Sequence, residues 1–149
     1  MLSKKSKYAI KALVCIAKNY GENVPMKISQ ISEMEKIPRK FLESILVELR
    51  NSGYVHSKMG AHGGYYLAKH PDEIVLTQII RLSGGPLALL PCVSLNFYES
   101  CEECENESTC GLRQVALEVR DATIRILSKT SLSDLIEREE KLKKSLQLS

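Results

Sequence analysis

A glycine-rich, basic segment between two short aromatic and β-branched runs is the feature that most constrains the fold of this chain. The flanking runs are residues 54–57 (Tyr-Val-His-Ser) and 65–68 (Tyr-Tyr-Leu-Ala). The segment between them reads Lys-Met-Gly-Ala-His-Gly-Gly. Such runs on both sides of a Gly-rich turn are typical of a β-hairpin with an exposed tip. The sequence therefore predicts a small hairpin at residues 54–68.

Three helical segments precede this predicted hairpin. Apolar residues recur at steps of three and four over residues 3–20, over a short stretch from residue 28, and over residues 41–49. Gly21 ends the first segment, the Ile37-Pro38 step ends the second, and residues 51–53 end the third. Three helices followed by a hairpin are typical of a winged helix-turn-helix, whose third helix enters the major groove of DNA. We therefore expect a mainly α-helical fold with one small β-hairpin.

Charge is unevenly distributed along the chain. Residues 1–70 contain 12 Lys and Arg against 5 Asp and Glu, a net charge of +7. Residues 71–149 contain 9 against 13, a net charge of −4, which gives +3 for the whole chain. A basic half indicates a polyanionic partner, since cations that neutralise phosphates release bound counterions. The alternative is an uneven surface that is merely solvated.

The N-terminal segment argues against a membrane protein or an exported one. Its longest apolar stretch covers residues 12–17, far short of the roughly 20 residues that span a bilayer. Lysines at positions 4, 5, 7 and 11 do not fit the apolar region and cleavage site of a signal peptide. We therefore expect a cytoplasmic protein with no membrane partner.

Five cysteines are divided between a helix and an acidic loop. Cys15 lies among apolar residues of the first helical segment, where a free thiol behaves as a small core side chain. The other four fall within nineteen residues, and in a reducing cytoplasm they indicate metal ligands or a redox switch. The neighbouring glutamates disfavour a reactive thiolate, so we expect no enzyme. The clustered cysteines are Cys92, Cys101, Cys104 and Cys110.

The Cys-x2-Cys pair within this cluster is compatible with either of two metal sites. Two thiolates on a short turn converge on one metal atom, in a zinc site or in an iron-sulfur cluster. Spacing alone leaves both open. A structural zinc site would be closed by all four cysteines and would carry no sensory chemistry.

Several residues are candidates for DNA contact because of their charge and position. Arg and Lys hold phosphates, whereas base edges need side chains on the groove-facing side of the third helix. Glu43 could accept a hydrogen bond from a cytosine amino group, or be a solvated carboxylate. The candidates are Lys4, Lys5, Arg39, Lys40, Glu43, Ser44, Lys58 and His62.

The second half of the chain predicts a short helix at residues 76–82, a long helix over residues 111–129 and a terminal helix from residue 132 that frays by Lys144. Apolar residues on the long helix repeat at alternating steps of three and four, as in a coiled-coil seam. This seam could pack on a partner or on its own domain. We predict a DNA-binding domain at residues 1–70 and a cysteine loop with dimerisation helices at residues 71–149. The seam residues are Leu112, Val115, Val119, Ala122 and Ile126.

Several motifs together resemble the Rrf2 family of bacterial winged-helix transcriptional regulators. They are Lys-Tyr-Ala-Ile-Lys-Ala-Leu at residues 7–13, Phe-Leu-Glu-Ser-Ile-Leu at 41–46, Gly-Gly-Tyr-Tyr-Leu-Ala at 63–68, Cys-Gly-Leu at 110–112 and Thr-Ser-Leu-Ser-Asp-Leu at 130–135. The resemblance covers nearly the whole chain. It implies a homodimer joined through the long helix, with two winged domains that read a two-fold operator in double-stranded DNA.

In the cluster-binding branch of that family, three cysteines before the long helix hold an iron-sulfur cluster that senses iron-sulfur status, redox state or nitric oxide. The resemblance assigns these positions to Cys92, Cys104 and Cys110, leaves Cys101 as a candidate fourth ligand, and favours a 2Fe-2S cluster. Arg113 replaces a His of some members, and Tyr8 an Asp of others. Met59 stands where many members have an Arg at the base of the wing, and it completes the DNA-contact candidates.

Overall fold

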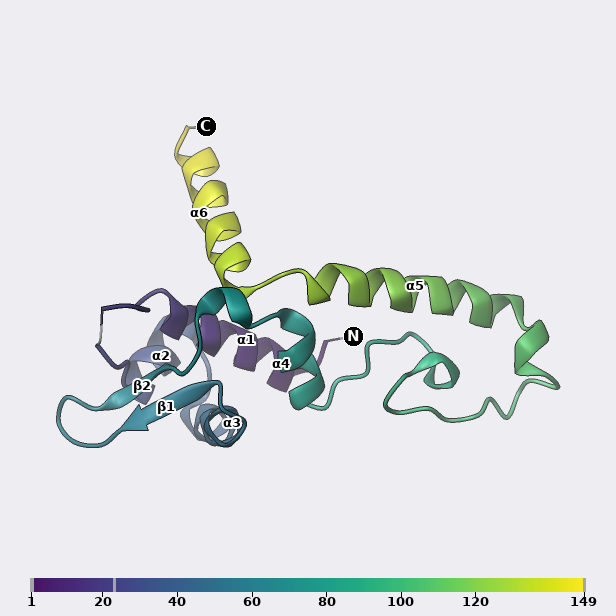
Figure 1. Cartoon of the computed structure of the whole chain (residues 1–149), viewed down its shortest axis with the longest axis horizontal. Helices are drawn as coiled ribbons and strands as arrows, with labels where there is room; N and C mark the ends of the chain where they lie inside the picture. Colours follow the sequence, from purple (N-terminus) through teal and green to yellow (C-terminus); the bar gives the residue numbers. More distant parts are fainter. Residues whose placement is uncertain (1, 23, 149) are drawn as a thin grey trace.

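The architecture comes from a computed structural model that describes residues 2–22 and 24–148. Figure 1 shows α1–α4 and the hairpin gathered together, with α5 extending away from them and α6 projecting in another direction. The predicted mainly α-helical fold with a small hairpin is confirmed. The elements are α1 (Lys4–Ala17), α2 (Ile28–Glu35), α3 (Arg39–Asn51), β1 (Val55–Lys58), β2 (Gly64–Leu67), α4 (Leu76–Leu82), α5 (Gly111–Ser128) and α6 (Leu132–Leu148), with short 3-10 turns at Pro71–Glu73, Pro91–Val93 and Glu107–Thr109.

Helix α1 lies at the centre of the fold. Ser3 caps its first turn, because the Ser3 hydroxyl accepts a hydrogen bond from the Ser6 backbone N–H at 3.0 Å. The apolar face of α1 is buried and contacts α2, α3, α4, α6 and β2. Cys15 is buried on this face, with its sulfur 3.8 Å from that of Met26, so its predicted place in the core is confirmed.

A tight break separates α2 from α3. Lys36 ends α2 in the left-handed conformation, at φ 54°. Pro38 then stands immediately before the first residue of α3. Helix α3 buries Leu42, Ile45 and Leu49 against α1, α2 and β1, so its opposite face is left to solvent.

The hairpin pairs β1 with β2 in antiparallel register, from Val55 opposite Leu67 to Lys58 opposite Gly64. A second pairing, which the sequence did not predict, joins the hairpin to the segment before α2. The Met26 N–H donates to the Tyr65 carbonyl at 2.9 Å, and the Tyr65 N–H donates to the Met26 carbonyl at 2.8 Å. The wing is therefore anchored at its base to the helical part of the domain.

The C-terminal helix α6 returns to the same core. Leu132 is fully buried there together with Ile74, whose carbonyl accepts the Leu132 N–H at 3.0 Å. Helix α6 continues to Leu148, so the prediction that it frays by Lys144 is wrong. The apolar pattern continues past that residue, and an ion pair between Glu137 and Lys141 supports the helix at i,i+4 spacing. Among the described residues, no helix is long and apolar enough to cross a membrane.

Candidate functional site

The solvent-facing side of α3 carries four of the predicted DNA-contact residues. Arg39, Lys40, Glu43 and Ser44 are all exposed there. The Arg39 guanidinium lies 3.6 Å from the Glu43 carboxylate, so these two side chains form an exposed ion pair. The Ser44 hydroxyl donates to the Phe41 carbonyl at 2.8 Å. This face presents two cations, a carboxylate and a hydroxyl side by side.

Val47 is on this face too, and the sequence analysis missed it. It is exposed and lies three or four residues after Glu43 and Ser44, the spacing of neighbours on one side of a helix. An apolar side chain in that position suits contact with the methyl group of a thymine. The helical spacing from Lys40 was the signal that could have found it.

The hairpin and the start of α1 carry the remaining candidates. Lys58 ends β1, and Met59 and His62 lie exposed in the turn, where Met59 has 91% of its surface open. Lys4 is exposed at the first turn of α1. Lys5 is different, because its ammonium group lies 2.7 Å from the Glu48 carboxylate of α3 and is partly neutralised. Lys4 and Lys58 form no ion pair among residues 2–22 and 24–148.

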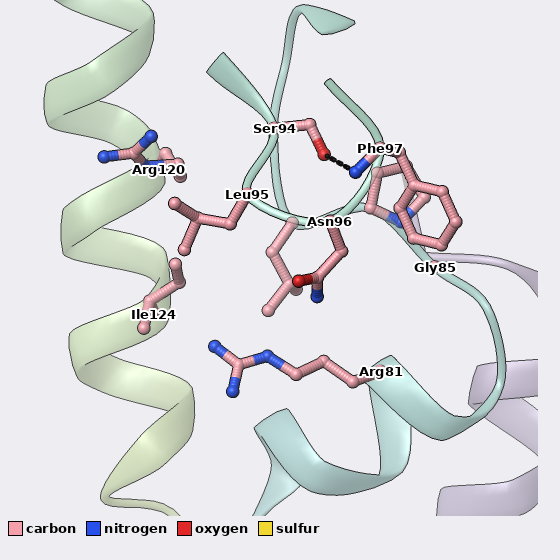
Figure 2. Close-up of a pocket in the computed structure, with 10 residues that line it drawn as sticks. Arg81, Gly85, Ser94, Leu95, Asn96, Phe97, Arg120 and Ile124 are labelled. Atoms are coloured by element: carbon pink, nitrogen blue, oxygen red, sulfur yellow. Dashed lines mark hydrogen bonds between the residues drawn. The ribbon is translucent and has the colours of Figure 1, made fainter.

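The cysteine loop, residues 92–110, is held against α5. Cys92 is buried in a small apolar cluster with Val93 and Ala116, and Cys101 packs against this cluster. Arg120 of α5 donates to the Val93 carbonyl at 2.8 Å. Figure 2 shows Arg120 beside Leu95, at a pocket of about 10 Å³ that Asn96 also lines. That space is the size of a single water molecule, so the loop packs closely against the helix here.

Three of the four clustered thiols interact with one another. The thiol of Cys104 interacts with those of Cys110 and Cys101. The interaction with Cys110, followed by partial burial and by the interaction with Cys101, raises the pKa of Cys104 to about 11. Cys110 caps α5, and its sulfur accepts the Arg113 backbone N–H at 3.4 Å. That hydrogen bond, followed by the contact with Cys104, lowers the pKa of Cys110. A thiolate at a helix N-terminus is further favoured by the helix dipole.

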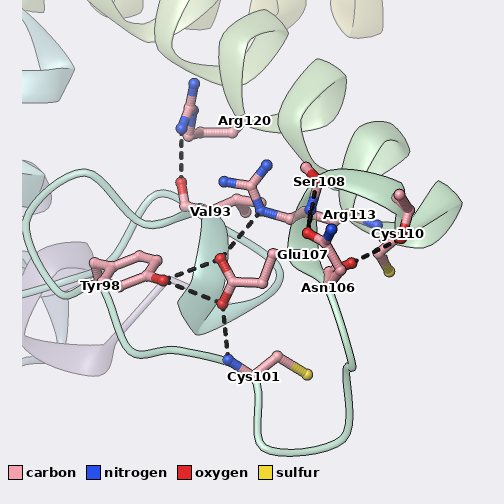
Figure 3. A network of polar contacts seen from close by, with 10 residues as sticks. Val93, Tyr98, Cys101, Asn106, Glu107, Ser108, Cys110, Arg113 and Arg120 are labelled. Atoms are coloured by element: carbon pink, nitrogen blue, oxygen red, sulfur yellow. Dashed lines mark hydrogen bonds and ion pairs between the residues drawn. The ribbon is translucent and has the colours of Figure 1, made fainter.

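A network centred on Glu107 joins this loop to the first turn of α5 (Figure 3). Tyr98 donates its hydroxyl to both carboxylate oxygens of Glu107, at 3.1 and 3.0 Å, and the Cys101 N–H donates at 2.9 Å. Arg113 lies 3.7 Å away as an ion-pair partner. The Cys101 N–H, followed by the Tyr98 hydroxyl, lowers the pKa of Glu107.

The donor set fits a metal bound by thiolates. Cys101, Cys104 and Cys110 interact, and Cys101 packs against the apolar cluster that contains Cys92. In the part of the chain that the structure describes, however, no three His, Cys, Asp or Glu side chains are arranged to hold a single ion. A 2Fe-2S cluster takes its four ligands as one pair on each iron, so it does not need three around one atom. The residues present suit such a cluster in chemistry, and the loop supplies them from several separate positions.

Comparison with known proteins decides the family of this chain. A family model, Rrf2, described as an iron-dependent transcriptional regulator, matches residues 2–138. The chain belongs to the Rrf2 family. Rrf2 proteins are transcriptional regulators that bind DNA, so the predictions of a DNA-binding regulator and of a non-enzyme are confirmed.

The matches extend over nearly the whole chain. A putative HTH-type transcriptional regulator of Rhodobacter capsulatus is 36% identical over 138 residues, covering 91% of this chain and 92% of the relative. The structure of CymR, described as the global cysteine regulator of B. subtilis, matches with a TM-score of 0.76 and 31% identity, covering 93% of this chain and 97% of that one. T. potens IscR matches with a TM-score of 0.73 and 26% identity, and the match covers 95% of this chain and 90% of that one. These likenesses confirm the winged-helix fold.

Proposed function

We propose that this Rrf2 regulator is a homodimer whose operator binding responds to an iron-sulfur cluster held by the cysteine loop. The observation that carries the proposal is the position of Cys110. It interacts with Cys104 in the loop and also caps α5, whose apolar seam is exposed. A change at the thiols therefore acts directly on the helix that we propose joins the two copies.

The exposed seam of α5 supports the homodimer. Leu112, Val115 and Ile126 have 67%, 57% and 59% of their surfaces open in the single chain. An apolar groove of about 340 Å³ includes Val119 of the same seam, and it is lined by Leu2, by residues of α1, α4 and α5 and by residues 85–89. Contiguous exposed apolar surface of this kind marks an interaction site. A second copy of the same helix buries it symmetrically.

The cysteine loop supports the sensory part of the proposal. Cys92, Cys104 and Cys110 are the proposed ligands, and Cys101 is the proposed fourth, since Arg113 contacts Glu107 and offers no free donor electron pair. A bound 2Fe-2S cluster would supply one-electron chemistry and sensitivity to oxidants. The chain's own part is to orient the Cys110 sulfur through the Arg113 N–H, and to shield Cys92 by burial.

The exposed faces of α3 and of the hairpin support the DNA-binding part. In this proposal Lys4, Arg39, Lys40 and Lys58 contact phosphates, while Glu43 and its neighbours meet base edges. We assign DNA reading to residues 1–70 and sensing with dimerisation to residues 71–149. Because its target is genomic DNA, we place the protein in the cytoplasm.

Chemical analysis of four single variants tests the ligand set. Cys92→Ala, Cys104→Ala and Cys110→Ala should each abolish stable cluster binding in anaerobically purified protein, measured as iron and sulfide per chain. Cys101→Ala should weaken it. A fully loaded Cys104→Ala protein would overturn the assignment. A colourless wild-type protein with stoichiometric zinc would instead establish a structural zinc site with no sensory chemistry.

Footprinting on the protein's own upstream region tests the regulatory part. Protection of a two-fold site, with different affinities for the cluster-loaded and cluster-free protein, is the expected result. Failure to protect any such site in both forms would count against the proposal. Glu43→Ala should change the ranking of operator variants, whereas an unchanged ranking would make this carboxylate a bystander.

A further inference from the structure

We infer that Glu107 is the positioning residue of the cysteine loop, because its carboxylate fixes Cys101 relative to the start of α5 and so sets how tightly the loop binds a metal through its thiols. This inference deepens the proposed function and rests on it only in taking the loop as a metal-binding segment. It assigns a role to a residue that is not itself a ligand.

The contacts of Glu107 distinguish it from the other acidic side chains of the loop. It accepts hydrogen bonds from the Cys101 backbone N–H and from the Tyr98 hydroxyl, and it pairs with Arg113. By contrast, Glu99, Glu102, Glu103 and Glu105 are exposed. Their side chains make no hydrogen bond or ion pair within the described residues. Glu107 is therefore the acidic residue that organises the loop, while these four are solvated.

These contacts form a chain that links two of the proposed ligands. The Cys101 N–H donates to Glu107, and Glu107 pairs with the Arg113 side chain. The Arg113 backbone N–H in turn donates to the Cys110 sulfur. Removing the carboxylate breaks this chain at a point that is neither a thiol nor part of α5.

Loss of Glu107 also changes the surroundings of Arg113. The Arg113 Nε is buried and has no hydrogen-bond partner, so the negative charge of Glu107 at 3.7 Å is what compensates it. Without that charge the buried Nε keeps neither a hydrogen bond nor a counter-charge, so the guanidinium, whose side chain is already 26% exposed, should turn further toward water. Movement of Arg113 disturbs the first turn of α5, where the Cys110 sulfur is held.

Cobalt binding to the reduced, metal-free full-length protein tests the inference. Co²⁺ bound by two or more thiolates gives a characteristic charge-transfer absorbance, so it reports the pairing of thiols that both an iron-sulfur cluster and a zinc site require. We expect Glu107→Ala to weaken Co²⁺ affinity by about 10- to 100-fold, the usual effect of removing an outer-shell partner. Glu107→Gln should lose less, since its amide oxygen still accepts the Cys101 N–H. Glu105→Ala is the matched control and should bind like the wild type.

Hydrogen exchange without metal provides the second readout. The Cys101 amide should exchange faster in Glu107→Ala than in Glu105→Ala, while the amides of α5 beyond its first turn keep their protection. Equal cobalt affinity in Glu107→Ala and Glu105→Ala would overturn the inference, as would loss of protection throughout α5, which would indicate a general role in folding. The proposed function fails separately: iron and sulfide analysis of the unaltered protein decides the cluster, and the two glutamate variants decide the positioning.

Discussion

Truncation of one seam residue gives a quantitative test of the proposed dimer. Ile126 has 59% of its surface exposed in the single chain. Full burial of an Ile side chain stabilises by about 1.5–3 kcal/mol, so burial of the exposed share is worth roughly 1–2 kcal/mol. A symmetric dimer buries two copies, or about 2–3.5 kcal/mol. At 1.4 kcal/mol for each tenfold change, Ile126→Ala should raise the dimer dissociation constant by roughly 20- to 300-fold.

Sedimentation velocity over a dilution series measures this dissociation constant, and far-UV circular dichroism checks that the helices are retained. Gln114→Ala is the control, because Gln114 is exposed on a different face of the same helix. It should leave the dissociation constant unchanged. If Ile126→Ala associates as tightly as the wild type, the seam is not the dimer interface.

Three further substitutions have outcomes that a single measurement can check. Lys40→Ala should weaken DNA binding across all sequences and reduce the slope of log K against log salt concentration by roughly one, measured by fluorescence anisotropy. Gly64→Ala should lower the melting temperature, because Gly64 has φ +145° and an added Cβ would collide with the Met26 carbonyl; an unchanged melting temperature would contradict this. Asp134 accepts from the Ser131 N–H and hydroxyl, which lowers the pKa of Asp134 below its ordinary value of 3.8. The contribution of the Asp134 carboxylate to the free energy of unfolding is therefore fully present above pH 3.8, and it is lost as the pH falls through the folded-state pKa. Asp134→Ala should melt earlier than the wild type at neutral pH, with the difference vanishing in acid.

Local signals were sufficient to predict most of the fold. Helix α4 was predicted at the residues where it is found, because Ser83 and the glycines after it stop a short apolar pattern. The hairpin follows from its Gly-rich turn. The pairing of Met26 with Tyr65 was not predictable, because it joins residues far apart in sequence and involves only backbone atoms. No side-chain pattern records such a bridge.

The candidate sites were harder to predict, because charge and spacing do not reveal partners. Lys5 satisfied every sequence criterion for a phosphate contact, yet it pairs with Glu48 on α3. Glu107 could not be distinguished from the neighbouring glutamates, since its role depends on how the loop folds back toward Arg113. Cys110 was better placed for prediction, because Gly111 and the apolar repeat after it indicate where the helix begins.

The position of the cysteine loop limits how it can affect the proposed DNA-contact face of α3. The loop meets α5 at Cys110 and, through the Val93 carbonyl, at Arg120. Beyond the far end of α5, the Thr130 carbonyl accepts the Leu76 N–H at 3.0 Å, and Leu132 enters the core that α3 also packs against. In the proposed mechanism a displacement of α5 would therefore move the winged domain joined to it. In the proposed symmetric dimer it would change the distance between two such domains, which must match half-sites separated by whole turns of DNA.

This arrangement predicts that the loop and α3 control different properties of DNA binding. In the proposed dimer, a loop variant such as Cys104→Ala should change the spacing of the two domains and leave the proposed base-contact residues of α3 in place. Its effect on affinity should be the same factor for every half-site sequence, and it should depend on the spacing between half-sites. Glu43→Ala should do the opposite, changing the ranking of half-site sequences at every spacing. Titrating both variants against a panel that varies sequence and spacing independently separates the two effects. If Cys104→Ala reorders half-site sequences at fixed spacing, the thiols act on the surface of α3 itself, and the transmission through α5 is wrong.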